Sequence, residues 1–297
     1  MSATALSSGV SPLAGLLAFA QGLAASGGAA GGLSVSAALL LFLAGAVAAA
    51  INSVAGGGSL VSFPMLVLLG VPPVQANATN SAALSPGSLS AALGIYSSLG
   101  PGCRDLWRLL PTTVLGAALG AWLLCHTSAR LFNLVVPPLL LLATVLLWQR
   151  PRLSRFVTER GARGAAQTRQ PAGGGASLWL AALVQLLISV YGGYFGAGMG
   201  ILMLAAFSLL LTGDTHQINA VRNWLAFVIN AVAALLLLSR GLVLLWPGLA
   251  LMAGALCGGF FAARLSRRIP AQTLHRGVVL LGFFLTLWFS AQALRSL

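Results

Sequence analysis

The sequence predicts an all-α integral membrane protein made of two inverted-topology repeats. Each repeat is a re-entrant or broken helical hairpin followed by three transmembrane helices. Three observations lead to this fold class. Of 297 residues, 58% are apolar and only 6% are charged, whereas a soluble domain carries roughly a quarter charged residues. The apolar residues gather in blocks, most of them long enough to span a bilayer. The second half of the chain repeats the order of features found in the first.

Composition divides the chain into four parts. Residues 1–32 form an Ala/Gly/Ser-rich N-terminal extension, 33–149 a first membrane repeat, 150–176 an Arg-rich cytoplasmic loop and 177–297 a second membrane repeat. The extension lacks a positively charged start, so we expect no cleaved signal peptide. The loop is placed in the cytoplasm by the positive-inside rule. It holds six arginines: Arg150, Arg152, Arg155, Arg160, Arg163 and Arg169.

Two apolar blocks are too short to cross the membrane. Spanning the hydrocarbon core takes about 20 helical residues, and 59–70 and 198–211 fall short of this. Both follow glycine clusters, where the backbone can turn freely. We therefore expect 33–70 and 177–211 to be broken or re-entrant hairpins with glycine tips near mid-bilayer; a glycine contact between ordinary helices is the alternative. The blocks are 33–54, 59–70, 77–98, 106–125, 131–149, 177–194, 198–211, 217–238, 242–263 and 271–293.

The two halves align with each other. A shift of 142 residues pairs the glycines of the two tips and the Asn-Ala pairs that follow them, and a shift of 138 pairs two GxxxG motifs. Three crossings after each hairpin make the second half inverted relative to the first, a recurring plan among transporters. The paired residues are Gly56 with Gly198, Gly58 with Gly200, Asn77 with Asn219, Ala78 with Ala220, Gly116 with Gly254 and Gly120 with Gly258.

Polar clusters open the long helix that follows each short one. In the first half, Asn77, Asn80 and Ser81 share a helical face, and Thr79 lies beside them; in the second half, Asn219, Arg222 and Asn223 do so. Amide and hydroxyl donors can replace the hydration shell of an anion, and a planar guanidinium suits an oxoanion. Hydrogen bonding between helices is the alternative for the Asn residues, and snorkelling to the interface is the alternative for Arg222.

The remaining reactive side chains indicate no enzyme. The three His and three Cys residues are scattered and form no metal-binding or catalytic motif, so we expect no catalytic residue, no metal and no cofactor. Asp214 and Thr215 are simplest as a helix N-cap, with a proton-relay role for Asp214 left open. The GxxxG glycines are expected to permit close helix contact.

The sequence then resembles a known family. The run from Ile51 to Leu60, with Pro64, Leu69–Pro73 and Ala76–Asn80, is similar to the first-half signature of the sulfite exporter TauE/SafE family. Residues 192–200, with Asn219–Asn223 and Asn230, are similar to its second-half signature, in which the position of Arg222 is usually basic. The resemblance covers roughly residues 33–293. It implies a multispanning carrier of sulfite, sulfonates or related organic anions in the cytoplasmic membrane.

These lines predict a transporter that moves a small anion across the inner (cytoplasmic) membrane by alternating access. A membrane-embedded enzyme or assembly factor, or an anion channel, is the alternative. The expected partners are membrane lipid and the anion, with no nucleic acid, and a homodimer is left open. We expect one anion site, where the two glycine tips and the two polar helix starts meet. The expected substrate-binding residues are Asn77, Thr79, Asn80, Ser81, Asn219, Arg222, Asn223, Gly56, Gly57, Gly58, Gly198 and Gly200.

Overall fold

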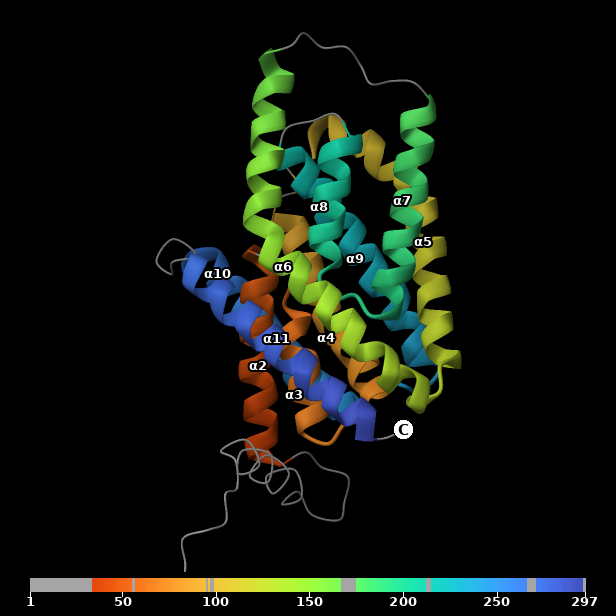
Figure 1. The fold of residues 1–297 in the computed structure, drawn as a ribbon, viewed down its shortest axis with the longest axis vertical. Coiled ribbons are helices and arrows are strands. Elements are labelled where there is room, and N and C mark those ends of the chain that lie inside the picture. Colours follow the sequence, from red (N-terminus) through yellow and green to blue (C-terminus); the bar gives the residue numbers. More distant parts are fainter. Residues whose placement is uncertain are drawn as a thin grey trace, which may run out of the picture.

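The protein is helical throughout the described part of the chain. The structure, a computed structural model, describes residues 34–54, 57–94, 96, 99–166, 175–211, 215–265 and 271–295. These ranges contain helices and turns and no strand, as the composition predicts (Figure 1). The elements are α2 (Val35–Val54), α3 (Ser59–Leu68), α4 (Pro73–Gly94), the 3-10 turn η2 (Gly100–Gly102), α5 (Cys103–His126), α6 (Ala129–Ala166), α7 (Gly175–Tyr194), α8 (Met199–Leu210), α9 (Thr215–Ser239), α10 (Leu245–Leu265) and α11 (Ala271–Arg295).

Five of these helices contain stretches long and apolar enough to cross a membrane: Val35–Asn52, Cys103–His126, Ala129–Gln149, Gln217–Ser239 and Arg276–Ala293. The helix α4 is 22 residues long, but it is rich in Asn, Ser and Thr and is not among them. Most of its polar side chains are buried, whereas leucines and tryptophans of α2, α5 and α6 are exposed. The molecule thus has an apolar exterior around a polar central helix.

Both predicted hairpins contain a short second helix. The helices α3 and α8 have 10 and 12 residues, close to the predicted blocks. At Gly58 the chain folds back so tightly on α2 that a Cβ there would lie 2.2 Å from the Ala48 carbonyl oxygen. Between α7 and α8 the backbone turns through Gly196 and Gly198, with φ of 75° and 76°, a region that favours glycine.

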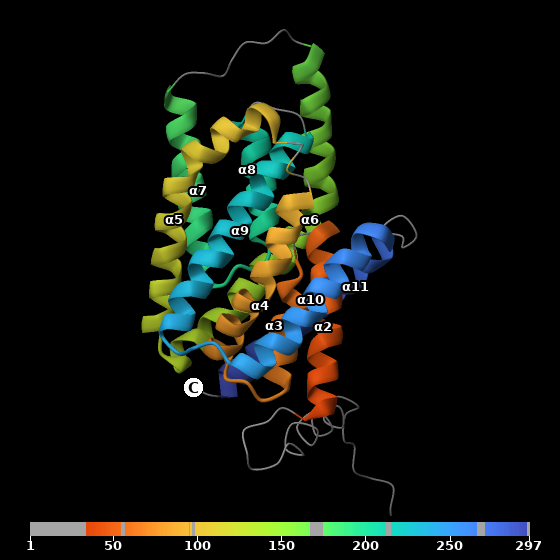
Figure 2. The same ribbon diagram turned by 180° about the vertical axis from the view of Figure 1, so that it is seen from behind.

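Each hairpin is held by a helix from the other half of the chain. The helix α5 packs along α7, and α10 packs along α2. A Cβ at Gly120 would lie 2.1 Å from the Val190 carbonyl oxygen, and one at Gly258 would lie 2.1 Å from that of Ala46. The GxxxG motifs therefore bring backbones into direct contact, as predicted. In the centre, α4 lies beside α9 and α10 (Figure 2).

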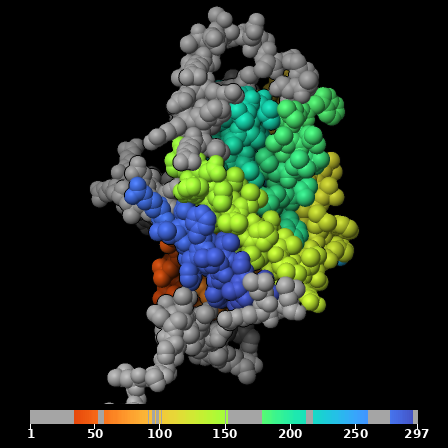
Figure 3. Space-filling model, in the orientation of Figure 1, coloured from red at the N-terminus to blue at the C-terminus, as the bar shows by residue number. Residues whose placement is uncertain are grey.

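The helix α6 is longer than the sequence analysis expects. The segment 150–176 was assigned to a loop, yet α6 continues through it to Ala166, because arginine and alanine are good helix formers. The helix runs obliquely along α11 (Figure 3) and then changes direction (Figure 1). Pro137, Pro138 and Pro151 lie within it, and internal prolines remove helical hydrogen bonds and produce kinks. The extension 1–32 lies outside the described residues.

We expect Gly120→Ala to destabilise the protein. The added methyl group would push α5 away from the α7 backbone, and such overpacking lowers the free energy of unfolding by about 1–3 kcal/mol. Gly277→Ala is the matched control, because nothing lies within 4 Å of a Cβ at Gly277 in α11. Thermal unfolding of the two purified variants measures the difference. Equal stability of both would contradict close packing at Gly120.

Candidate functional site

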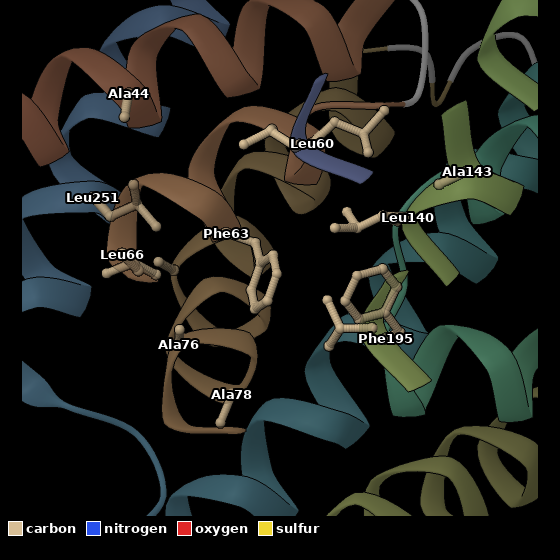
Figure 4. Close-up of a cluster of buried hydrophobic side chains, with 14 of the residues drawn as sticks. Ala44, Leu60, Phe63, Leu66, Ala76, Ala78, Leu140, Ala143, Phe195 and Leu251 are labelled. Atoms are coloured by element: carbon tan, nitrogen blue, oxygen red, sulfur yellow. The ribbon is translucent and has the colours of Figure 1, made fainter. Parts of the chain in front are cut away.

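The two hairpins touch each other inside the bundle. The ring of Phe63 in α3 lies edge-on to that of Phe195, which follows α7, with 5.4 Å between ring centroids. Figure 4 shows these two rings facing each other, with Leu140 of α6 beside them. Phe63 and Phe195 are fully buried. The halves therefore meet through apolar contacts in the interior.

The glycine tips converge on α6. A Cβ at Gly57 would lie 3.4 Å from the Leu147 side chain, and one at Gly198 would lie 3.3 Å from the Ala143 backbone. Leu147 and Ala143 are one helical turn apart, about 6 Å along the axis. Gly200 is buried in the first turn of α8, and Gly56 lies outside the described residues. The tips thus approach within the bundle.

The first polar cluster, at the start of α4, is hydrogen-bonded to both hairpins. Asn77 donates from Nδ2 to the carbonyl oxygen of Tyr194 at the end of α7, at 2.7 Å. Asn80 Oδ1 accepts a hydrogen bond from the Ser62 hydroxyl of α3 at 2.5 Å. These bonds link the start of α4 to both hairpins. The predicted alternative, hydrogen bonding between helices, thus accounts for part of what the two asparagines do.

Thr79 binds a different element. Its Oγ1 accepts a hydrogen bond from the backbone N–H of Leu244, just before α10, at 2.9 Å. Thr79 is fully buried, and Ser81 is buried one turn beyond Asn77. Thr79 therefore fixes α10 against the start of α4.

The second cluster lies near the start of α9. Arg222 is only 7% exposed and donates from its guanidinium to Asn223 Oδ1 at 3.0 Å. Asn219, three residues before Arg222, is partly buried. With so little exposure, the Arg222 side chain lies inside the protein, which argues against snorkelling to the water interface. A buried cation beside an amide is chemically suited to an anion.

The structure does not bring the two clusters together. The helices α4 and α9 are antiparallel, because Thr79 binds Leu244 beyond the end of α9, while Gly102 contacts Val221 near its start. They cross where Asn230 donates to Ser88. Asn80 lies eight residues before Ser88, and Arg222 lies eight residues before Asn230, on opposite sides of this bond. Each residue is therefore about 12 Å from the bond along its helix, so the two are about 24 Å apart along the helices. The predicted residues therefore lie in two separate clusters.

Several buried polar residues were not singled out from the sequence. The Tyr191 hydroxyl donates to the Ala197 carbonyl oxygen across the break, and Ser62 binds Asn80. A buried amide, Gln185, donates to Thr113 and Ser189 between α5 and α7. In the sequence, the only indication of these residues is that Tyr191 directly precedes a glycine-rich segment. In the described part of the chain, no three His, Cys, Asp or Glu side chains gather where they could hold a metal ion.

Comparisons with known proteins give consistent similarities. The profile of the family described as "Sulfite exporter TauE/SafE" matches residues 40–289. A "Probable membrane transporter protein" of Haemophilus influenzae is 29% identical over 247 residues, covering 83% of this chain and 92% of the relative. "Probable membrane transporter protein YfcA" of Escherichia coli K12 is 26% identical over 226 residues, covering 76% and 79%. "Probable membrane transporter protein ORF9" of Sinorhizobium is 27% identical over 250 residues, covering 83% and 90%. No solved structure gives a significant match.

We expect Thr79→Val to lower the free energy of unfolding by about 1–3 kcal/mol, because the Leu244 N–H would lose its acceptor. Thr79→Ser keeps the hydroxyl oxygen and serves as the control. Chemical or thermal unfolding of the two variants provides the measurement. If the valine variant were as stable as the serine variant, the hydroxyl would not hold α10 in place.

Proposed function

Because the chain belongs to the sulfite exporter TauE/SafE family, and is thus a membrane transporter, we propose that it moves a small oxoanion across the cytoplasmic membrane as a secondary transporter. The substrate class is sulfite, a sulfonate such as sulfoacetate, or a related organic anion. The family and the names of the relatives support a transport function. The buried polar and basic side chains support a negatively charged substrate.

One observation carries the choice of an anion. Arg222 is buried within a 25-residue apolar helix, where an arginine is expensive to keep and usually functional. Its planar guanidinium can offer two parallel N–H groups to a sulfite, sulfonate or carboxylate. Asn223 and Asn219 lie on the same face and add amide donors.

The starts of the short helices add partial positive charge. The N-cap residues of α3 and α8 are Gly58 and Gly198, and the N–H groups of Val61 and Ile201 donate to their carbonyl oxygens. The N-terminal end of a helix carries partial positive charge, which favours a negative ligand near these glycines, near Gly57 and Gly200, and near Gly56, the residue before Gly57 in the sequence. We include all five glycines in the proposed substrate path.

The two polar clusters suit alternating access. Asn77, Thr79, Asn80 and Ser81 lie towards the end of the bundle where α4 begins, and Asn219, Arg222 and Asn223 towards the end where α9 begins. An anion leaving one cluster must reach the other along the α4–α9 pair, where Ser88 and Asn230 form a polar contact. We propose that rocking of one half against the other passes the anion between the clusters and opens them to opposite sides.

The packing supports an inverted repeat behind this motion. Exchanging each helix for its counterpart turns the α2–α10 contact into the α7–α5 contact, and leaves the α4–α9 and α6–α11 contacts unchanged. Ser88 and Asn230, which bond to each other, are 142 residues apart, the shift that aligns the halves. The connections α5–α6 and α9–α10 and the C-terminus share one end of the bundle (Figure 1), as inverted halves require.

We expect Arg222→Gln to reduce the kcat/KM of anion uptake tenfold or more. Losing a charge-assisted hydrogen bond removes about 1.5–3 kcal/mol, and about 1.4 kcal/mol corresponds to a factor of ten. Uptake of labelled sulfite or sulfoacetate into proteoliposomes measures this, and saturation of the flux distinguishes a carrier from a channel. Arg240→Gln is the control, since Arg240 is exposed in the α9–α10 connection. Equal uptake by both variants would remove Arg222 from the proposed site.

A further inference from the structure

One atom of the first polar cluster is left without a hydrogen bond. Asn77 is 1% exposed, and its Nδ2 donates to Tyr194 O. Its Oδ1 is buried and has no hydrogen-bond partner among the described residues. Leaving a buried acceptor unpaired costs about 1–3 kcal/mol, so natural proteins rarely do so without a reason.

The amide group that carries this oxygen lies at the carbonyl end of α7, because its Nδ2 is bonded to Tyr194 O. The last carbonyl groups of a helix lack helical partners and carry partial negative charge. Here the N–H groups of Phe195 and Gly196 both point to Tyr191 O, at 2.9 and 3.2 Å. Regular helical geometry would direct the Gly196 N–H to the Gly192 carbonyl instead. The break thus diverts the Gly196 N–H from the Gly192 carbonyl oxygen, which lies in the same last turn of α7 as the Tyr194 carbonyl bonded to Asn77.

The surroundings of Asn77 Oδ1 favour a monovalent cation. Hard cations prefer oxygen ligands, and divalent ions usually take carboxylates as well. The three acidic residues of the chain are Asp105, Glu159 and Asp214. Of these, Asp105 lies in the first turn of α5, which packs along α7 with Thr113 bonded to Gln185. Asp105 therefore lies towards the start of α7 and away from its carbonyl end. A site built from amide and carbonyl oxygens alone neutralises one positive charge more readily than two. Transporters with broken helices use such carbonyl ends to hold sodium.

We propose that Na⁺ binds between Asn77 Oδ1 and the carbonyl end of α7, and that it is the coupling ion of the transporter. The coupling role rests on the proposed anion transport, whereas the binding does not. Asn77 joins the two roles: Oδ1 faces the cation, and the second hydrogen of its Nδ2 can be donated to an anion. Moving one Na⁺ with the anion cancels one of its negative charges, which lowers the electrostatic barrier in the bilayer.

Binding is tested on the full-length purified protein by thermal unfolding in NaCl, KCl and choline chloride at equal ionic strength. A ligand of the folded state stabilises it increasingly with concentration, so we expect a saturable rise in Tm with NaCl only. Asn77→Ala should abolish this rise. Asn77→Asp loses the hydrogen bond to Tyr194 O, which lowers Tm in all three salts, but it should retain the Na⁺-dependent rise, since a carboxylate still supplies oxygen. The aspartate variant keeps the test valid if the alanine variant does not fold.

Gln185→Ala is the matched control. Gln185 is also fully buried, and its Oε1 also has no partner in the described ranges. It lies within the body of α7, where the helix carbonyls are paired, and not at the end of the helix. The Na⁺-dependent rise in Tm should therefore survive this substitution. A wild-type protein that responds equally to the three salts, or an Asn77→Ala variant that still responds to Na⁺, would overturn the site.

Coupling is tested separately in proteoliposomes by imposing a Na⁺ gradient during anion flux. We expect the gradient to accelerate uptake by the wild type and by Gln185→Ala, and to have no effect on Asn77→Ala. Sodium-specific stabilisation together with gradient-independent anion flux would overturn the coupling role while leaving the binding site. Absence of any anion flux would instead count against the proposed function.

Discussion

The structure depends on keeping two breaks in the backbone inside a membrane protein. Lipid offers no hydrogen bonds, so irregular backbone at that depth must be enclosed by protein. The enclosure comes from helices of the opposite half: α5 along α7 and α10 along α2, each brought into backbone contact by glycines. At the break between α7 and α8, side chains supply hydrogen bonds to the backbone carbonyl groups. Tyr191 donates to the Ala197 carbonyl oxygen, and Asn77 donates to that of Tyr194.

Much of the fold follows from the sequence, because apolar block length and glycine clusters report on the bilayer directly. The short helices α3 and α8 and the close contacts at Gly120 and Gly258 are of this kind. The helix that each glycine motif contacts does not follow from the sequence. Helical periodicity shows that Gly120 lies on a contact face but not that the facing helix is α7. Likewise, nothing in the 150–176 segment marks where α6 ends, because arginine is compatible with both helix and loop.

The separation of the two polar clusters is the main difference from the predicted site. Sequence reasoning places Asn77 and Asn219 at equivalent positions of two repeats and expects them to meet. The inverted repeat proposed above would account for this separation, because equivalent positions of inverted repeats lie on opposite sides of the axis that relates them and only residues near the axis can touch. Ser88 and Asn230 contact each other, whereas Asn80 and Arg222 do not. Under that proposal, one polar cluster lies towards each end of the α4–α9 pair.

The central claim is that the two hairpins meet inside the bundle, and cross-linking tests it most directly. In a chain with Cys103, Cys125 and Cys257 replaced by serine, Phe63→Cys and Phe195→Cys would be combined and treated in native membranes with a small thiol-bridging reagent. Because the two rings are in contact, mass spectrometry should find peptides from α3 and from the α7–α8 break joined within one chain. Free thiols at both positions, under conditions that label Arg240→Cys fully, would contradict the account.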